Sequence, residues 1–391
     1  MTTLVIARFL GHRCRIIWRS VGAEDFLCLR LSLRMHFLIV GQGLAGTLLG
    51  YRLERAGHRV EYVDAPGQTA ASSVAAGIIN PITGRRFVKS WRIDELIPAA
   101  RELYRELEAL LDVSLWHELP LIRTLYNRGD ENDWLARTAD PGYADYMEEK
   151  PKVGRIPSLT EDVHAYAGVR HAARVDIGVL VTAYRERLQR EGRLREETFD
   201  YQKLEAGSGD AAGARYYPAG QEVPITYDTV IFCEGWRARF NPWFGALPHG
   251  GNKGEVLLVK TEAPLLERMF KHRVFLVPFT EDTYWIGATS ENQFSEENPT
   301  AVNRQFLEDR LREVLTVPYE IVEHRAAVRP TVRDRRPFLG RHPQLPALAI
   351  FNGLGTKGTS LAPLCSRWLA DHLLTDAALP PEVDIRRWEQ P

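Results

Sequence analysis

The feature that most constrains the fold is a run of closely spaced glycines directly after a short apolar segment. Residues 36–40 read His-Phe-Leu-Ile-Val and predict a buried strand, and residues 41–46 read Gly-Gln-Gly-Leu-Ala-Gly, which is G-x-G-x-x-G. Apolar residues then recur with helical period, and Gly57 is placed to end the helix. A second apolar strand, 59–63, ends at Asp64. This strand–loop–helix–strand order predicts a dinucleotide-binding unit.

Each residue type in this unit has a physical role in holding a dinucleotide. Gly41 permits the tight turn, Gly43 lets the backbone approach a pyrophosphate, and Gly46 permits close packing of helix on strand. The helix N-terminus offers free N–H groups and the positive end of its dipole to the phosphates. Asp64 can accept hydrogen bonds from the ribose hydroxyls. The fingerprint by itself leaves NAD and FAD open.

Composition excludes several other classes of protein. The chain has 391 residues, 45% of them hydrophobic and 26% charged, which is typical of a soluble globular protein. Lys and Arg number 50 against 51 Asp and Glu, and this balance argues against a general nucleic-acid binder. No apolar run reaches the roughly 18 residues that a membrane-spanning helix needs.

The cysteine and histidine patterns predict neither a metal site nor a disulfide framework. Cys14, Cys28, Cys233 and Cys365 form no C-x-x-C pair. The sequence contains neither an H-E-x-x-H zinc helix nor a G-x-S-x-G nucleophile elbow. We therefore expect no metal, and a cytoplasmic location as the default for a chain without secretory features.

Residues 1–34 differ in composition from the rest of the chain. They hold six Arg, no Lys and only two acidic residues, Glu24 and Asp25, and Met35 immediately precedes the first strong strand. Three interpretations stay open: a mis-assigned start codon with Met35 as the true start, an Arg-rich targeting segment, or a structural extension. The segment is left out of the fold prediction.

Three later segments are also rich in glycine or small residues. Residues 69–86 combine Ala, Ser and Thr with Gly77, so that the backbone could approach a flat, bulky group. Residues 227–236 read as a buried strand that ends in glycine and an aromatic residue. A strand at 348–351 runs into a glycine-rich loop at 353–359 and then an amphipathic helix. This second strand–loop–helix unit could bring another helix N-terminus to a negatively polarised group.

In this order, the features resemble the FAD-dependent oxidoreductases of the D-amino-acid oxidase and glycine oxidase group. The oxidase module that modifies the tRNA wobble uridine has a similar layout. The resemblance extends over about residues 35–375. It rests on the segments 41–46, Asp64, 71–77, 174–176, 228–236, 284–289, 328–331 with Asp334 and 337–340, and 353–363.

The resemblance implies FAD as the cofactor and a set of residues that bind it. The ADP half would lie on the 41–46 loop and Asp64, and the isoalloxazine on the backbone around 72–77 and 353–358. Donors and a helix N-terminus at the pyrimidine end of a flavin favour its reduced state. Phe199, on the strand predicted to precede Tyr201, is expected to contact the adenine. The predicted set is Gly41, Gly43, Leu44, Ala45, Gly46, Asp64, Ser72, Ser73, Ala75, Ala76, Gly77, Phe199, Gly235, Trp236, Gly353, Gly355, Thr356, Lys357 and Gly358.

Two cations are the predicted catalytic residues. Arg329 matches the arginine with which the family grips a substrate carboxylate, a task that suits a bidentate guanidinium. The alternative for Arg329 is a structural ion pair, for example with Asp334. Lys357 stands where glycine oxidase-like members often carry arginine, and it could hold the flavin C2 oxygen region or a substrate anion. This departure leaves open whether glycine itself is the substrate.

The helix and strand patterns predict an α/β (α+β) fold in which two domains interleave. We assign a discontinuous Rossmann-like FAD-binding domain to residues 35–90, 165–240 and 325–391, and an antiparallel-sheet substrate domain to residues 91–164 and 241–324. The active site should lie between them. Helices are expected at 94–112 and 176–191, and strand-like runs occur at 117–126, 165–175, 196–201, 254–260, 273–279, 284–289 and 318–328.

The predicted function is oxidation of the C–N bond of an amino acid or related amine by hydride transfer to flavin N5. The partners would be a small-molecule amine and an electron acceptor, oxygen or a quinone, whereas the oligomeric state stays open. One alternative is a flavin-binding module that acts on a larger substrate, such as modified tRNA, or with a partner subunit. The basic cluster within residues 85–92 would then serve docking. An NAD-dependent dehydrogenase is a further alternative that leaves the 353–358 loop unexplained.

Overall fold

A computed structural model of the chain describes residues 8–10, 13–15, 34–154, 156–160, 162–207, 213–262, 266–280 and 282–388. The interpretation of residues 1–34 lies almost wholly outside these residues. Within that segment, β1 (Arg8–Leu10) pairs antiparallel with β2 (Arg13–Arg15).

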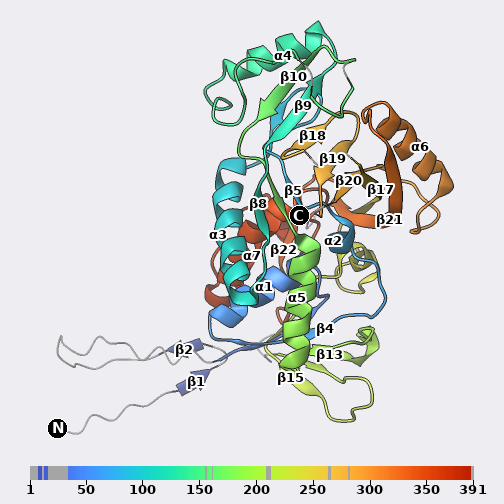
Figure 1. Ribbon diagram of the computed structural model, residues 1–391. Coiled ribbons are helices and arrows are strands. Elements are labelled where there is room, and N and C mark those ends of the chain that lie inside the picture. Colours follow the sequence, from blue (N-terminus) through green and yellow to red (C-terminus); the bar gives the residue numbers. More distant parts are fainter. Residues whose placement is uncertain are drawn as a thin grey trace.

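A six-stranded sheet forms one half of the molecule (Figure 1). Neighbouring strands are parallel except β22 and β23, which are antiparallel. The strand order reverses beside β3, and ligands bind at such a switch point, outside the carboxyl ends of the strands. In spatial order the strands are β12 (Leu194–Arg195), β4 (Arg59–Val63), β3 (His36–Val40), β16 (Thr229–Phe232), β23 (Leu348–Asn352) and β22 (Phe338–Arg341).

Strand β3 is buried on both faces, which explains its unbroken apolar run. Phe37 and Ile39 pack in the cluster that includes residues of α1, α3 and α7, whereas Leu38 and Val40 pack in the cluster that includes the small sheet β13–β14–β15. These elements are α1 (Leu44–Arg55), α3 (Ile93–Leu111), α7 (Gly358–Thr375), β13 (Leu204–Ala206), β14 (Ala214–Tyr216) and β15 (Ile225–Tyr227).

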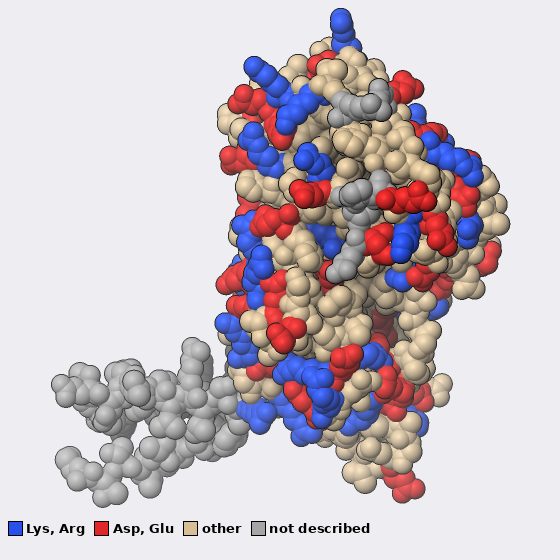
Figure 2. All heavy atoms as spheres, in the orientation of Figure 1, with Lys and Arg blue, Asp and Glu red and all other residues tan. Residues whose placement is uncertain are grey.

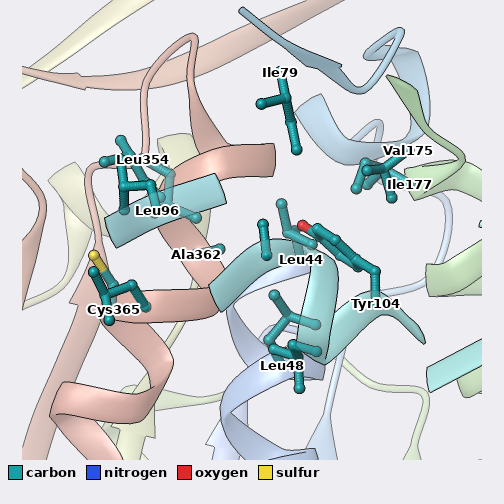
Figure 3. Packing of buried hydrophobic residues seen from close by; sticks show 14 of the residues in the cluster. Leu44, Leu48, Ile79, Leu96, Tyr104, Val175, Ile177, Leu354, Ala362 and Cys365 are labelled. Atoms are coloured by element: carbon teal, nitrogen blue, oxygen red, sulfur yellow. The ribbon is translucent and has the colours of Figure 1, made fainter. Parts of the chain in front are cut away.

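The three helices meet in one apolar contact region (Figure 3). Leu44 and Leu48 of α1, Leu96 of α3 and Ala362 of α7 belong to the same buried cluster. The hydroxyl of the buried Tyr104 donates to the carbonyl of Thr359 at 2.8 Å, so its polar atom is satisfied. This contact joins the middle of α3 to the first turn of α7.

A seven-stranded sheet forms the other half, and its neighbours are antiparallel except β9 and β18. Side chains alternate between its faces. Leu257 and Ile286 pack outward with Leu307 of the covering helix α6 (Ala301–Arg312), whereas Val256 and Trp285 pack inward, toward the parallel sheet. In spatial order the strands are β10 (Ala165–Val169), β9 (Leu121–Leu125), β18 (Met269–Lys271), β19 (Phe275–Pro278), β20 (Thr283–Gly287), β17 (His249–Thr261) and β21 (Tyr319–Val332).

Shorter elements connect the two halves. A three-stranded sheet of β5, β11 and β8 is antiparallel, and α5 follows β11 directly. These elements are β5 (Ile78–Ile79), β11 (Ala173–Val175), β8 (Trp116–Glu118), α5 (Ile177–Arg190), α2 (Ala71–Val74), β6 (Ile82–Thr83), β7 (Val88–Lys89), α4 (Arg128–Thr138) and the 3-10 turns η1 (Tyr201–Lys203), η2 (Gly235–Phe240) and η3 (Ile385–Trp388).

Both expected helices form, as α3 and α5, but the strand predicted at 196–201 is wrong. The chain leaves the sheet after β12, which pairs with β4 through Leu194 and Arg195 alone. Phe199 consequently lies in a loop.

β10 and all of β21 belong to the seven-stranded sheet, although the domain prediction counted residues 165–169 and 325–332 with the FAD-binding domain. The domain boundaries stay a proposal.

The surface carries both signs of charge. On the face in Figure 2, Lys and Arg side chains are interspersed with Asp and Glu, in keeping with the net charge of -1. Among the described helices, none is long and apolar enough to cross a membrane.

We predict that Gly46→Ala destabilises the protein by roughly 2 kcal/mol or more, because close-packed backbone cannot give way. A Cβ at Gly46 would lie 2.1 Å from the carbonyl oxygen of Gly41. Urea unfolding midpoints measure the effect. Gly178→Ala in α5 is the control. Apart from its own helix and chain neighbours, no described residue comes within 4 Å of a Cβ at Gly178, so this substitution should be neutral or slightly stabilising. Equal midpoints for the two variants would contradict this account of the glycine.

Candidate active site

One cavity of about 770 Å³ extends from the carboxyl ends of the parallel strands to the inner face of the seven-stranded sheet. Its wall includes Gly41 and Asp64 on the first side and Trp285 and Arg329 on the second. Its size is within the range of cofactor and ligand sites. Segments from both sheets therefore contribute to one site.

The 41–46 loop forms the floor of this cavity at the switch point. Gly41 has φ +101, and a Cβ there would lie 2.5 Å from the carbonyl oxygen of Cys233, so only glycine fits. Gly43, Leu44 and Ala45 line the cavity, and α1 begins without a side-chain cap and without an acid in its first turn. Its N–H groups and positive dipole end are therefore available to an anion. Gly46 does not line the cavity and serves packing.

Asp64 is held at the cavity wall by two neighbours that sequence reasoning missed. Its carboxylate accepts the backbone N–H of Gln42 at 2.9 Å and the guanidinium of Arg185 at 2.6 Å. Arg185 also donates to the side-chain oxygen of Gln42 at 3.2 Å. Arg185 lies on α5, more than a hundred residues away in the sequence, so no spacing rule could have linked it to Asp64.

The small-residue segment lines the cavity. Ser72, Ser73, Ala75, Ala76 and Gly77 all contribute to the wall. Its position is set by close contacts on both sides. A Cβ at Gly77 would lie 1.8 Å from the carbonyl oxygen of Val175, and the indole N–H of Trp285 donates to the carbonyl of Val74 at 2.8 Å.

The C-terminal glycine loop contributes some of its predicted residues and not others. Gly355, Thr356 and Gly358 line the cavity, and α7 begins there without a side-chain cap. Gly353 and Lys357 are not part of the cavity wall. Gly353 has φ +77, and a Cβ there would lie 2.4 Å from a methyl group of Val332, so this glycine serves packing.

The ammonium of Lys357 points away from the cavity wall. It donates to the hydroxyls of Ser90 at 3.1 Å and Thr83 at 3.3 Å. Burial, followed by the nearby Arg336 and Arg335, lowers the pKa of Lys357. A contact of this side chain with the flavin or the substrate stays a prediction.

Aromatic residues and a partly buried carboxyl line the cavity beside β16. Phe199 stacks on Tyr216 with 4.5 Å between ring centroids. Gly235 and Trp236 also line this end. Glu234, which sequence reasoning did not single out, accepts hydrogen bonds from the Tyr201 hydroxyl at 2.5 Å and the Asn241 amide at 2.9 Å. Burial raises the pKa of Glu234 to about 7, although both hydrogen bonds oppose the shift.

Arg329 projects from β21 into the cavity. Its guanidinium donates to the side-chain oxygen of Asn252 at 2.6 Å and to the carbonyl of Thr289 at 3.3 Å. Gly254 makes room for it, because a Cβ there would lie 2.0 Å from a guanidinium nitrogen. Among the described residues, Arg329 has no acidic partner. The alternative partner Asp334 pairs instead with Arg387 at 2.8 Å.

The basic cluster at 85–92 lies outside the cavity wall. Lys89 pairs with Asp94 at 2.8 Å, and Arg92 pairs with Glu95 at 2.7 Å. Two of its four cations are therefore neutralised by neighbours on the same part of the chain.

The described residues fit a flavin dinucleotide. Two uncapped helix N-termini, of α1 and α7, reach one cavity, so both the pyrophosphate and the pyrimidine end of a flavin could find donors. Asp64 presents a carboxylate for ribose hydroxyls, and the small-residue segment offers backbone without bulky side chains. No group of three or more described residues could hold a metal ion.

This arrangement is that of a dinucleotide-dependent oxidoreductase, and comparison with known proteins identifies the family. The family model for FAD dependent oxidoreductases matches residues 36–372. The chain belongs to this family and its cofactor is FAD, which confirms the predicted family and cofactor over the NAD alternative.

One relative and one solved structure, both named glycine oxidase, are similar over most of the chain. The glycine oxidase of Geobacillus kaustophilus is 24% identical over 368 residues, which cover 86% of this chain and 92% of that protein. The crystal structure of glycine oxidase from this species matches with a TM-score of 0.74 over 89% of this chain and 97% of that chain, at 24% identity. This likeness confirms the predicted fold class.

A longer relative shares only part of its length with this chain. The bifunctional protein ThiO/ThiG of Nostoc sp. is 24% identical over 375 residues, which cover 88% of this chain and 53% of that protein. The chain therefore spans about half the length of the bifunctional relatives it matches.

We predict that the free energy of unfolding of the native protein falls as the pH rises, and that Glu234→Gln abolishes this fall. Folding raises the pKa of this carboxyl from an ordinary value of 4.5 to about 7, so the folded state favours its protonated form. The protein therefore loses stability as the carboxyl ionises, between about pH 5 and 8. By pH 8 this loss amounts to as much as about 3 kcal/mol. Urea unfolding of the FAD-free protein across this range is the measurement. The exposed Glu222→Gln should keep the native slope, and the same slope for Glu234→Gln would refute the assignment.

Proposed function

We propose that the protein oxidises the C–N bond of a small amino acid or related amine that presents its carboxylate to Arg329. The observation that supports this most is the guanidinium of Arg329 itself. It lies on the cavity wall, is fixed by two neutral oxygens, and has no acidic partner among the described residues. A desolvated charge without a counter-charge is unfavourable, and a bidentate carboxylate would supply one. Relatives named glycine oxidase support the same substrate class.

The proposed chemistry divides between the cofactor and the chain. Bound FAD supplies a hydride acceptor at flavin N5. Arg329 holds the substrate carboxylate and so orients the neighbouring C–H bond, while Asn252 and the carbonyl of Thr289 hold the guanidinium. The apolar walls formed by Val256 and Trp285 exclude water.

The atoms balance without a side-chain base. The substrate binds with its amine neutral, loses a hydride from carbon and a proton from nitrogen, and leaves as an imine. Water then hydrolyses the imine to a keto acid or aldehyde and ammonia or a smaller amine. The contribution of the chain is positioning and electrostatics, not proton abstraction.

The finer points of the reaction belong to the same proposal. The electron acceptor is oxygen or a quinone, and the reaction takes place in the cytoplasm.

The proposed division into domains accompanies this function. The FAD-binding domain comprises residues 35–90, 165–240 and 325–391, and the substrate domain comprises residues 91–164 and 241–324. Strands β10 and β21 complete the sheet of the substrate domain. A larger substrate is the weaker alternative, because Lys89 and Arg92 of the basic cluster already have acidic partners.

We predict that Arg329→Lys raises KM for the amino-acid substrate at least tenfold, with FAD still bound, because a point charge cannot form the bidentate pair. The loss of one charge-assisted contact has about this magnitude. Steady-state kinetics and the flavin absorbance per mole of protein measure the two quantities. Arg325→Lys on the same strand is the control, because that side chain pairs with Glu323 outside the cavity. Unchanged KM in Arg329→Lys would remove the proposed anchor.

A further inference from the structure

A second cation, Lys271, lines the same cavity. It ends strand β18, where Phe270 packs in the outer cluster with α6 and Met269 packs in the inner cluster. Because side chains alternate along a strand, Lys271 shares the inward direction of Met269. It is half-buried and forms part of the cavity wall.

The ammonium of Lys271 is held by neutral groups. It donates to the carbonyl of Arg273 at 2.9 Å and lies 4.4 Å from the ring centroid of Phe275. An ammonium has three donors, so further hydrogen-bonding capacity remains. Among the described residues no carboxylate pairs with it. The carbonyl and the ring hold the cation in place but do not neutralise it.

A neighbouring cation adds to the positive potential at this end. Arg123 of β9 is the register partner of Lys271. Its guanidinium lies 4.4 Å from the ring centroid of Phe87 and donates to the carbonyl of Gly84 at 3.3 Å. It too has no acidic partner in the described part of the chain. Arg123 does not line the cavity, but its charge would also attract an anion bound beside Lys271.

The backbone positions that Arg329 and Lys271 contact lie close together in the seven-stranded sheet. Arg329 touches the carbonyl of Thr289, two residues beyond Gly287, and Gly287 is the register partner of Phe275. Residues 288 and 289 follow the end of β20, and two residues span at most about 7 Å. Adjacent strands lie about 5 Å apart, so these backbone positions are at most about 12 Å apart. Lys271 lies against the ring of Phe275, at the side of this interval away from Arg329.

Building on the amine oxidation proposed above, we propose that the substrate carries a second carboxylate. Arg329 holds the carboxylate next to the reacting C–H bond, and Lys271 binds the other one beside Phe275. The substrate class is therefore an amino acid or N-substituted glycine with two carboxylates. Lys271 is a specificity-determining residue, because it selects the distal group and takes no part in hydride transfer.

The protonation of Lys271 suits this role. Burial, and then the charge of Arg123, lowers the pKa of Lys271 to about 8. Phe275 of the adjoining β19 contributes an uncharged ring. The ammonium is thus present at neutral pH and lost as the pH rises through about 8. Preference for a dicarboxylate should fall over that interval.

The test uses the full-length FAD-loaded protein and matched pairs of ligands that differ by one charge. N-(carboxymethyl)glycine, D-aspartate and D-glutamate are compared with their monoamides in flavin reduction and in kcat/KM. Glutarate and its monoamide, which cannot be oxidised, are titrated against the flavin spectrum and thermal stability. The variants are Lys271→Met, Lys271→Arg and, as control, Lys260→Met on the same sheet, an exposed lysine paired with Asp282.

The native protein should prefer at least one dicarboxylate to its monoamide by tenfold or more in kcat/KM and bind glutarate correspondingly more tightly. Lys271→Met should bring both ratios close to one while the FAD content stays unchanged. Lys271→Arg should retain most of the preference, and Lys260→Met all of it. A native ratio near one, or a ratio unaffected by Lys271→Met, overturns the proposal.

The outcomes also separate this proposal from the amine oxidation on which it rests. If monocarboxylic amines such as glycine or sarcosine reduce the flavin but the charge ratio is near one, the second anion site fails and the oxidation stands. If glutarate binds in a Lys271-dependent manner but none of the amines reduces the flavin, the anion site stands and the oxidation fails.

Discussion

The close backbone approach around the first glycine loop is the constraint on which the rest of the structure depends. Gly41 lies against the carbonyl of Cys233, and Gly46 lies against Gly41 itself, so β3, β16 and α1 meet without intervening side chains. This contact places the uncapped start of α1 at the switch point of the parallel sheet. The dinucleotide site follows from that placement, because no side chain in the described part of the chain caps these N–H groups.

Charge in the cavity is distributed unevenly between its two sides. On the dinucleotide side, Asp64 and Arg185 form an ion pair, and burial favours the protonated form of Glu234. On the sheet side, Arg329 and Lys271 contact only neutral groups among the described residues. On the sheet side, the anionic groups of the proposed substrate would supply the missing counter-charge. The contacts of these anionic groups with Arg329 and Lys271 would then both bind the substrate and orient it.

Sequence patterns predicted the dinucleotide side of the cavity because the residues that form it lie close together in the chain. The glycine spacing, the helical stripe and Asp64 lie within thirty residues of one another, and Ser72 to Gly77 follow directly. The predicted strand at 196–201 failed because edge pairing stops after Arg195, a consequence of tertiary pairing that propensity does not contain. The cofactor contact predicted for Gly353 stays a prediction, and the structure adds that this glycine makes room for Val332. The sequence offers no means to tell these two uses of a glycine apart.

The sequence alone therefore determined the family, the cofactor, the placement of the first glycine loop and the identity of Arg329 as a candidate anchor. Only the tertiary structure decided that Arg185 reaches Asp64, that Lys357 turns toward Ser90, and that Lys271 faces the cavity with Arg329. The reason is physical. The hydrogen-bonding capacity of a residue and the spacing of apolar residues can be read from a short stretch of chain. The balance of buried charge depends instead on groups that strand pairing brings together from distant segments.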